Sequence, residues 1–138
     1  MTFGEAIKSV YGKYATFSGR SRRSEYWFFQ LFFIIVYFFA MLAAAFMPNN
    51  PDGTPGALTM GIFGLFALFV FGSLIPLLSL AVRRLHDSNH SGWWLLISFV
   101  PFVGGILLLI WYCTPGTTGP NKYGADPKAT PANAASVF

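Results

Sequence analysis

Charged side chains are scarce in this sequence. Only 10% of its 138 residues are charged, whereas 54% are hydrophobic and 19% are aromatic. Ordinary soluble domains carry about 25% charged residues. A chain with so few charges cannot cover its own core with a polar surface. The composition therefore excludes an ordinary soluble domain and indicates a membrane protein.

Cysteine and acidic residues are scarce as well. The single cysteine, Cys113, excludes an intramolecular disulfide, and the sequence offers it no evident base. The five Asp and Glu residues are scattered, and no phosphate-binding glycine loop follows a predicted strand. We therefore expect a protein that is not an enzyme and that binds neither a cofactor nor a metal.

What the chain does contain is three long apolar runs, at residues 26–47, 57–82 and 93–113. The first has 22 residues, which form a helix about 33 Å long, enough to cross a hydrocarbon core of about 30 Å. Pro76 predicts a kink in the second run. Pro101 and the pair Gly104-Gly105 predict a bend in the third helix or the close approach of another helix. The sequence thus predicts an all-α, polytopic membrane protein with three transmembrane helices, in one membrane domain over residues 1–128.

The segments outside these runs have distinct compositions. Thr2-Phe3-Gly4-Glu5 fits a capping box and predicts a short amphipathic interfacial helix over residues 2–14. Two placements of this helix stay open, on the membrane surface or against the protein's own loops. Residues 48–56 are rich in proline, glycine and asparagine, which predicts a tight extramembrane loop. We expect a disordered alanine-rich tail at residues 129–138.

The positions of lysine and arginine predict the orientation. Five precede the first run, none lies between the first two, two lie between the second and third, and two follow. With three spans, this places seven positive residues on one side against two on the other. The positive-inside rule therefore predicts a cytoplasmic N-terminus and a periplasmic or extracellular C-terminus. Because the positive residues flank apolar runs, we expect anionic lipid and not nucleic acid as their partner.

Two charged segments meet at the cytoplasmic boundary in this arrangement. We predict that Glu25 contacts Arg83 or Arg84, and that Asp87 contacts an arginine of the first segment, because an unpaired carboxylate beside hydrocarbon is costly. Under a structural hypothesis, Glu25, Asp87 and His86 interlock the helices. Under a compatible functional hypothesis, surplus arginines form a rim that binds lipid phosphate or a protein partner. The rim residues are Arg20, Arg22, Arg23, Arg83 and Arg84.

One further constellation involves histidine. His86, Asp87 and His90 resemble the zinc-protease pattern His-Glu-x-x-His. Asp87 is one methylene shorter than the glutamate of that pattern, and no third ligand is evident. A metal-dependent membrane enzyme is therefore the least favoured hypothesis.

Several separated motifs occur in a fixed order along the chain. They are FSGRSRRSEYW at residues 17–27, RRLHD at 83–87, SGWW at 91–94, Pro101, and GTTGPNKYGADP at 116–127. Together they resemble the bacterial domain-of-unknown-function 805 family of small inner-membrane proteins, over about residues 3–128. The resemblance implies a bacterial inner-membrane location, an all-helical fold and no established enzymatic activity.

The favoured function is a non-enzymatic membrane protein whose arginine-rich cytoplasmic rim binds anionic lipid headgroups or a protein partner. A homo-oligomer is a further expected form of association. The alternative is a subunit of a small oligomeric channel or transporter, suggested by Pro76, Pro101 and the glycines at membrane depth.

Overall fold

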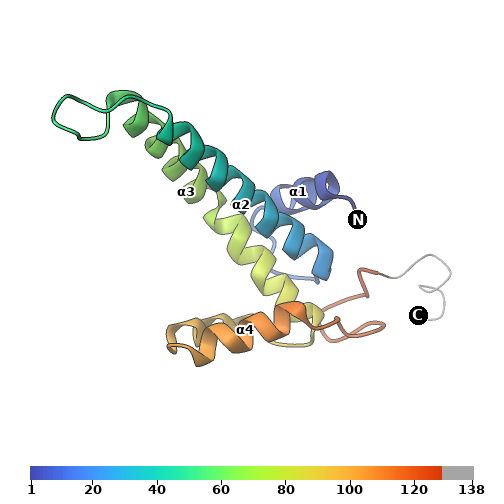
Figure 1. The fold of residues 1–138 in the computed structure, drawn as a ribbon. Helices are drawn as coiled ribbons and strands as arrows, with labels where there is room; N and C mark the ends of the chain where they lie inside the picture. The colour runs from blue at the N-terminus through green and yellow to red at the C-terminus, as the bar shows by residue number, and fades with distance from the viewer. Residues whose placement is uncertain (129–138) are drawn as a thin grey trace.

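The computed structural model describes residues 1–128, so the expected tail at 129–138 lies outside the described residues (Figure 1). Five helical segments follow one another along the chain. They are α1 (Phe3–Gly12), α2 (Arg23–Ala45), α3 (Ala57–Asp87), the 3-10 helix η1 (Gly92–Phe99) and α4 (Val103–Cys113). The all-helical class is confirmed for this part of the chain.

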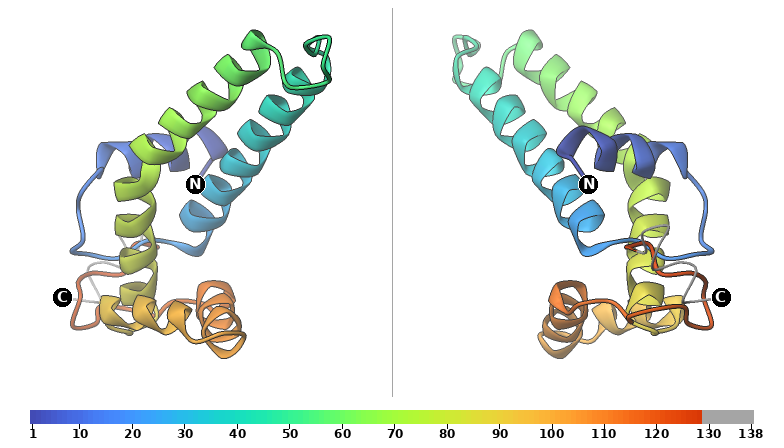
Figure 2. Two further views of the ribbon diagram at one scale, coloured as in Figure 1. Left: turned by 90° about the vertical axis from the view of Figure 1, so that its left-hand side faces the viewer. Right: turned by 90° about the vertical axis from the view of Figure 1, so that its right-hand side faces the viewer.

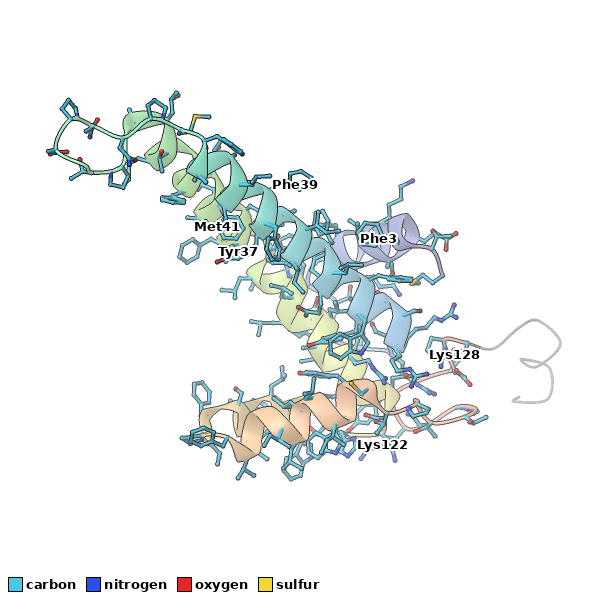
Figure 3. The ribbon with its side chains drawn as sticks, viewed as in Figure 1. Phe3, Tyr37, Phe39, Met41, Lys122 and Lys128 are labelled. Atoms are coloured by element: carbon cyan, nitrogen blue, oxygen red, sulfur yellow. The ribbon has the colours of Figure 1, made fainter. Side chains whose placement is uncertain are left out.

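Helices α2 and α3 form a long antiparallel hairpin, joined by a loop at the far end of the molecule (Figure 1). Both are long and apolar enough to cross a membrane, and only 6% and 22% of their most apolar windows are buried within the chain. Figure 3 shows Tyr37 and Phe39 projecting from α2. Such exposed apolar surface suits lipid as the solvent and not the interior of a soluble protein. Two of the three expected spans are thus present as continuous helices.

Pro76 lies inside α3, and α3 bends between its two halves (Figure 2). Proline has no N–H, so the carbonyl of Gly72, four residues earlier, loses its helical donor. The hydroxyl of Tyr14 donates to that carbonyl instead. The proline therefore creates an acceptor that the N-terminal segment uses.

The expected single helix over residues 93–113 is wrong. The chain forms η1, turns at residues 100–102, and returns as α4, with Phe102 at a φ of 64°. The two segments pack closely, because a Cβ on Gly104 would lie 1.7 Å from the Ile97 carbonyl oxygen. Helix α4 has 11 residues and is about 17 Å long, too short to cross a bilayer core of about 30 Å. The structure therefore does not confirm a third spanning helix.

Helix α1 begins with the predicted capping box. The Thr2 hydroxyl accepts from the Glu5 N–H, and the Glu5 carboxylate accepts from the Thr2 N–H. Val10 of α1 is fully buried, and the hydroxyl of Tyr11 lies 2.8 Å from that of Ser73 in α3. Tyr11 also contacts Phe29 of α2 edge to face. Helix α1 thus packs across the two long helices. One of the two expected placements had it packing only against the protein's own loops.

Candidate functional site

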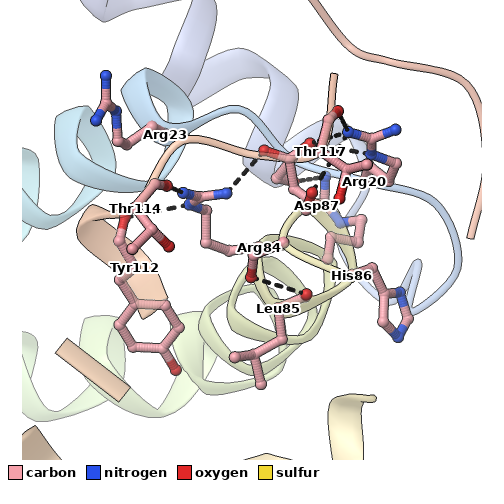
Figure 4. Close-up of polar contacts among 12 residues, drawn as sticks. Arg20, Arg23, Arg84, Leu85, His86, Asp87, Tyr112, Thr114 and Thr117 are labelled. Atoms are coloured by element: carbon pink, nitrogen blue, oxygen red, sulfur yellow. Dashed lines mark hydrogen bonds and ion pairs between the residues drawn. The ribbon is translucent and has the colours of Figure 1, made fainter. Parts of the chain in front are cut away.

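The candidate site is a buried cluster of charged residues at the end of the molecule where α2 begins and α3 ends (Figure 4). It brings together residues from the segment before α2, from α3 and from the chain after α4. Its ionic members are at most 6% exposed: Arg20, Glu25, Arg83, Arg84 and Asp87. Charges this deeply buried need partners, because desolvation of each ion costs several kcal/mol.

Asp87 joins two arginines. Nη2 of Arg20 lies 2.9 Å from Oδ1 of Asp87, and Nη1 of Arg84 lies 2.7 Å from Oδ2. Arg20 also donates from Nε to Oδ1, so both nitrogens on one edge of its guanidinium face the carboxylate. The predicted contact between Asp87 and an arginine of the first charged segment is confirmed. It ties the start of the first long helix to the end of the second.

Glu25 forms the second ion pair. Its Oε1 lies 3.2 Å from Nη1 of Arg83 and accepts from the Ser9 hydroxyl at 3.0 Å. The same Arg83 nitrogen donates to the Ser21 hydroxyl at 2.9 Å. The predicted contact of Glu25 with Arg83 or Arg84 is therefore confirmed, through Arg83. This pair adds α1 to the assembly.

Residues 114–126, which we call the strap, have a role at the ion pairs that the sequence alone did not predict. Arg20 donates to the carbonyls of Thr117 and Gly119, and the N–H of Thr117 donates to the Asp87 carbonyl at 2.7 Å. A Cβ on Gly116 would lie 2.0 Å from Oδ2 of Asp87. The strap therefore lies directly on the ion pairs. Gly116 was the one sequence feature that could have indicated this contact, since only a residue without a side chain lets the strap come so close to Asp87.

The arginines also cap helix α4. The last carbonyls of a helix lack intrahelical donors and carry the negative end of the helix dipole. Arg84 donates to the carbonyls of Tyr112 and Thr114, and Arg23 donates to the carbonyl of Cys113 at 2.9 Å. The buried cluster as a whole holds three arginines, Arg20, Arg83 and Arg84, and two carboxylates, Glu25 and Asp87. The carbonyls of α4 and the strap therefore stabilise the surplus positive charge.

The two histidines have different neighbours. His86 contacts the Gly19 carbonyl through Nδ1 at 3.0 Å and stacks on Tyr123 with ring centroids 4.0 Å apart. His86 therefore takes part in the interlock by contacting the Gly19 carbonyl and the Tyr123 ring, and not by forming an ion pair. His90 stacks on Trp111, and burial lowers the pKa of its imidazole. Within residues 1–128, no group of three side chains suited to holding a metal occurs.

Burial also divides the five arginines of the predicted rim. Arg20, Arg83 and Arg84 are buried, whereas Arg22 is partly exposed and Arg23 is exposed. Lys122 and Lys128 lie at the same end of the molecule (Figure 3). We call the cations of this end with exposed or partly exposed side chains the basic face: Arg22, Arg23, Lys122 and Lys128. Lys8 and Lys13 are exposed at α1.

Comparison with known proteins gives a consistent result. The family described as "Protein of unknown function (DUF805)" matches residues 14–125. Inner membrane protein YhaI of Escherichia coli (strain K12) is 42% identical over 120 residues, covering 87% of this chain and 92% of the relative. Inner membrane protein YhaH of the same organism is 37% identical over 122 residues, covering 88% and 95%. No solved structure matches the chain.

Proposed function

The chain belongs to the DUF805 family of proteins of unknown function, and from that premise we propose that it is a non-enzymatic inner-membrane protein whose basic face binds anionic phospholipid headgroups. The observation that carries the proposal is the distribution of cations. None of the nine lysines and arginines lies in the loop between α2 and α3. Juxtamembrane cations attract anionic lipid by about 1 kcal/mol each.

The proposal includes a topology that differs from the one expected from sequence. Arg20 precedes α2 and contacts both Asp87 and Gly119, which supports placing these three residues on one side of the membrane. Helices α2 and α3 supply two crossings between Arg20 and Asp87. The chain from Gly92 to Cys113 then leaves and returns on the same side. Both the N-terminal segment and the strap are cytoplasmic in this topology.

This topology agrees with the positive-inside rule better than three spans do. Four cations before α2, Arg23 at its first position, two at the end of α3 and two in residues 114–128 make nine on one side, and the opposite loop has none. Three spans would have separated them seven to two. The η1–α4 hairpin, with Phe99 82% and Phe102 87% exposed, then inserts its apolar turn into the cytoplasmic leaflet without crossing it.

Cysteine labelling tests the topology. In a Cys113→Ser background, a single cysteine is placed by Asp52→Cys in the α2–α3 loop or by Lys128→Cys after the strap. A membrane-impermeant maleimide applied to spheroplasts should label the Asp52→Cys chain at once, and the Lys128→Cys chain only after permeabilisation. Labelling of both chains in intact spheroplasts would contradict this topology and support the three-span arrangement.

Lipid selectivity tests the binding function. In reconstituted membranes, spin-labelled phosphatidylglycerol should associate with the protein several-fold more than phosphatidylcholine, and salt should reduce the preference. Neutralising Arg22, Arg23, Lys122 and Lys128 to glutamine should bring the ratio close to one. Asp52→Asn, a charge change in the opposite loop, serves as the control. A ratio that the quadruple variant leaves unchanged would remove the basic face as the lipid site.

A further inference from the structure

An apolar groove runs between α3 and η1, beneath Phe17. Two overlapping hollows of about 440 and 400 Å³ share Phe17, Val82, Gly92 and Trp93 as lining residues. Each has the size of a pocket for a small organic ligand. A Cβ on Gly92 would lie 2.7 Å from Cγ1 of Val82, so η1 sits tightly against α3 at this point. The close packing of η1 against α3 at Gly92 therefore fixes the position of the groove between them.

The groove changes in polarity along its length. Leu78, Val82 and His86 line it from α3 at a spacing of four residues, which places them on one face of the helix. Phe99 lines the end near Leu78, and Ser91 lines the end near His86. The apolar end thus lies toward the middle of α3, and the polar end lies at its charged terminus.

The polar end lies near one cation, Lys122, which is not itself among the residues that line the groove. His86 stacks on Tyr123, and Nζ of Lys122 lies 5.1 Å from the centre of the Tyr123 ring. Two carboxylates at this end are already engaged: Asp87 binds two arginines, and Asp126 accepts the N–H groups of Gly119 and Lys128. An anionic group at this end would therefore meet a cation without facing a free carboxylate.

We propose that this groove holds one acyl chain of an anionic phospholipid, with the headgroup phosphate beside His86 and Lys122. The polarity and charge of the groove match such a molecule in the orientation that it has in the cytoplasmic leaflet, which rests on the proposed topology. A second copy or a peptide would not require a cation near one end of the groove and a chiefly apolar lining at the other. The site shares Lys122 with the basic face and differs from it in having apolar walls, which hold an acyl chain as well as a headgroup.

Native mass spectrometry of the full chain in mild detergent tests the proposal. After delipidation, phosphatidylglycerol and phosphatidylcholine with identical acyl chains are titrated separately. We expect one phosphatidylglycerol bound with an affinity several-fold above that of phosphatidylcholine. Leu78→Trp fills the apolar end and should weaken binding of both lipids on the order of tenfold, about 1.4 kcal/mol. Leu31→Trp, on α2 and outside the groove lining, is similarly exposed at 45% against 42% for Leu78 and should stay within about twofold.

The polar end is tested with Lys122→Gln, which should remove the preference for phosphatidylglycerol and leave the affinity for phosphatidylcholine unchanged. Equal binding by Leu78→Trp and the unmodified chain would overturn the groove site. A dimer that Leu78→Trp dissociates would identify a second copy as the occupant and also overturn it. The boundary-lipid selectivity of Leu78→Trp in membranes should stay normal, so failure of the groove site and failure of the basic face are distinguishable.

Discussion

The two halves of α3 follow opposite rules of burial. Before Pro76, Leu65, Leu68 and Phe71 are each at least 70% exposed, although they are among the most apolar side chains of the chain. After it, Arg83 and Arg84 are at most 1% exposed. One helix therefore has apolar side chains outside along its first half and charged side chains inside along its second.

This difference follows from the two solvents that a membrane protein meets. Lipid gives no hydrophobic driving force for helix association, so the α2–α3 pair is held there by close contacts such as that between Phe33 and Phe69. At the basic end, ion pairs and main-chain carbonyls satisfy most of the buried charged groups, although Nε and Nη2 of Arg83 have no hydrogen-bond partner. We therefore expect the stability of the tertiary structure to depend chiefly on the basic end.

The largest expected effect comes from Asp87→Ala. The substitution leaves Arg20 and Arg84 buried without their carboxylate. Removing one partner of a buried ion pair typically destabilises a protein by about 3–5 kcal/mol. We expect a loss of this size in the free energy of unfolding, measured by denaturant titration in mixed micelles. Asp52→Ala, in the exposed loop at the other end, should change it by less than about 0.5 kcal/mol. Similar effects of both substitutions would contradict the comparison of the two halves.

A smaller effect is expected from Gly116→Ala. The added methyl group would overlap the Asp87 carboxylate, which cannot move without straining its bonds to two arginines. Overpacking of this kind costs about 1–3 kcal/mol. The strap should lift, so limited proteolysis should cleave residues 114–126 faster than in the unmodified chain. Gly64→Ala in α3, where a Cβ meets no atom within 4 Å, is the matched control and should leave cleavage unchanged.

Much of the basic end could be predicted from sequence. Two apolar runs with arginines at the same ends place Glu25 near Arg83 and Asp87 near Arg20, because an antiparallel hairpin aligns those positions. The capping box of α1 was also evident from Thr2 and Glu5. These features depend on local spacing and on the cost of an unpaired carboxylate.

The third apolar run could not be assigned in the same way. Its composition fits a spanning helix, and the turn at Pro101 and Phe102 depends on the contact of Gly104 with η1. Whether a proline bends a helix or ends it is decided by such tertiary contacts. The count of three spans then placed the strap across the membrane from Arg20, so its contacts with the arginines were missed.

The junction between the two halves gives a third prediction. Tyr14→Phe removes the donor to the Gly72 carbonyl that Pro76 leaves without a helical partner. We expect a loss of about 1 kcal/mol in the free energy of unfolding, the typical net worth of one hydrogen bond. In a Pro76→Ala background, the new N–H at position 76 can pair with that carbonyl, so the loss should shrink. Tyr37→Phe, on the exposed face of α2, is the control. Equal losses in both backgrounds would show that the two residues are not coupled.

The smallest expected effect concerns α1, which covers the junction. The N–H of Thr2 is the main cause that lowers the pKa of Glu5 below its ordinary value of 4.5. A carboxyl group whose pKa is lower in the folded state stabilises that state above its unfolded pKa, and this contribution is lost as the pH falls through the folded value. Compared with Glu5→Gln, the unmodified chain should therefore protect the amides of α1 more strongly from hydrogen exchange at neutral pH, after correction for intrinsic rates. The difference should decline below pH 4.5 and vanish once Glu5 is protonated, while amides of α3 near Arg84 serve as the internal control. A difference that persists in acid would show that the charge of Glu5 does not hold the first turn of α1.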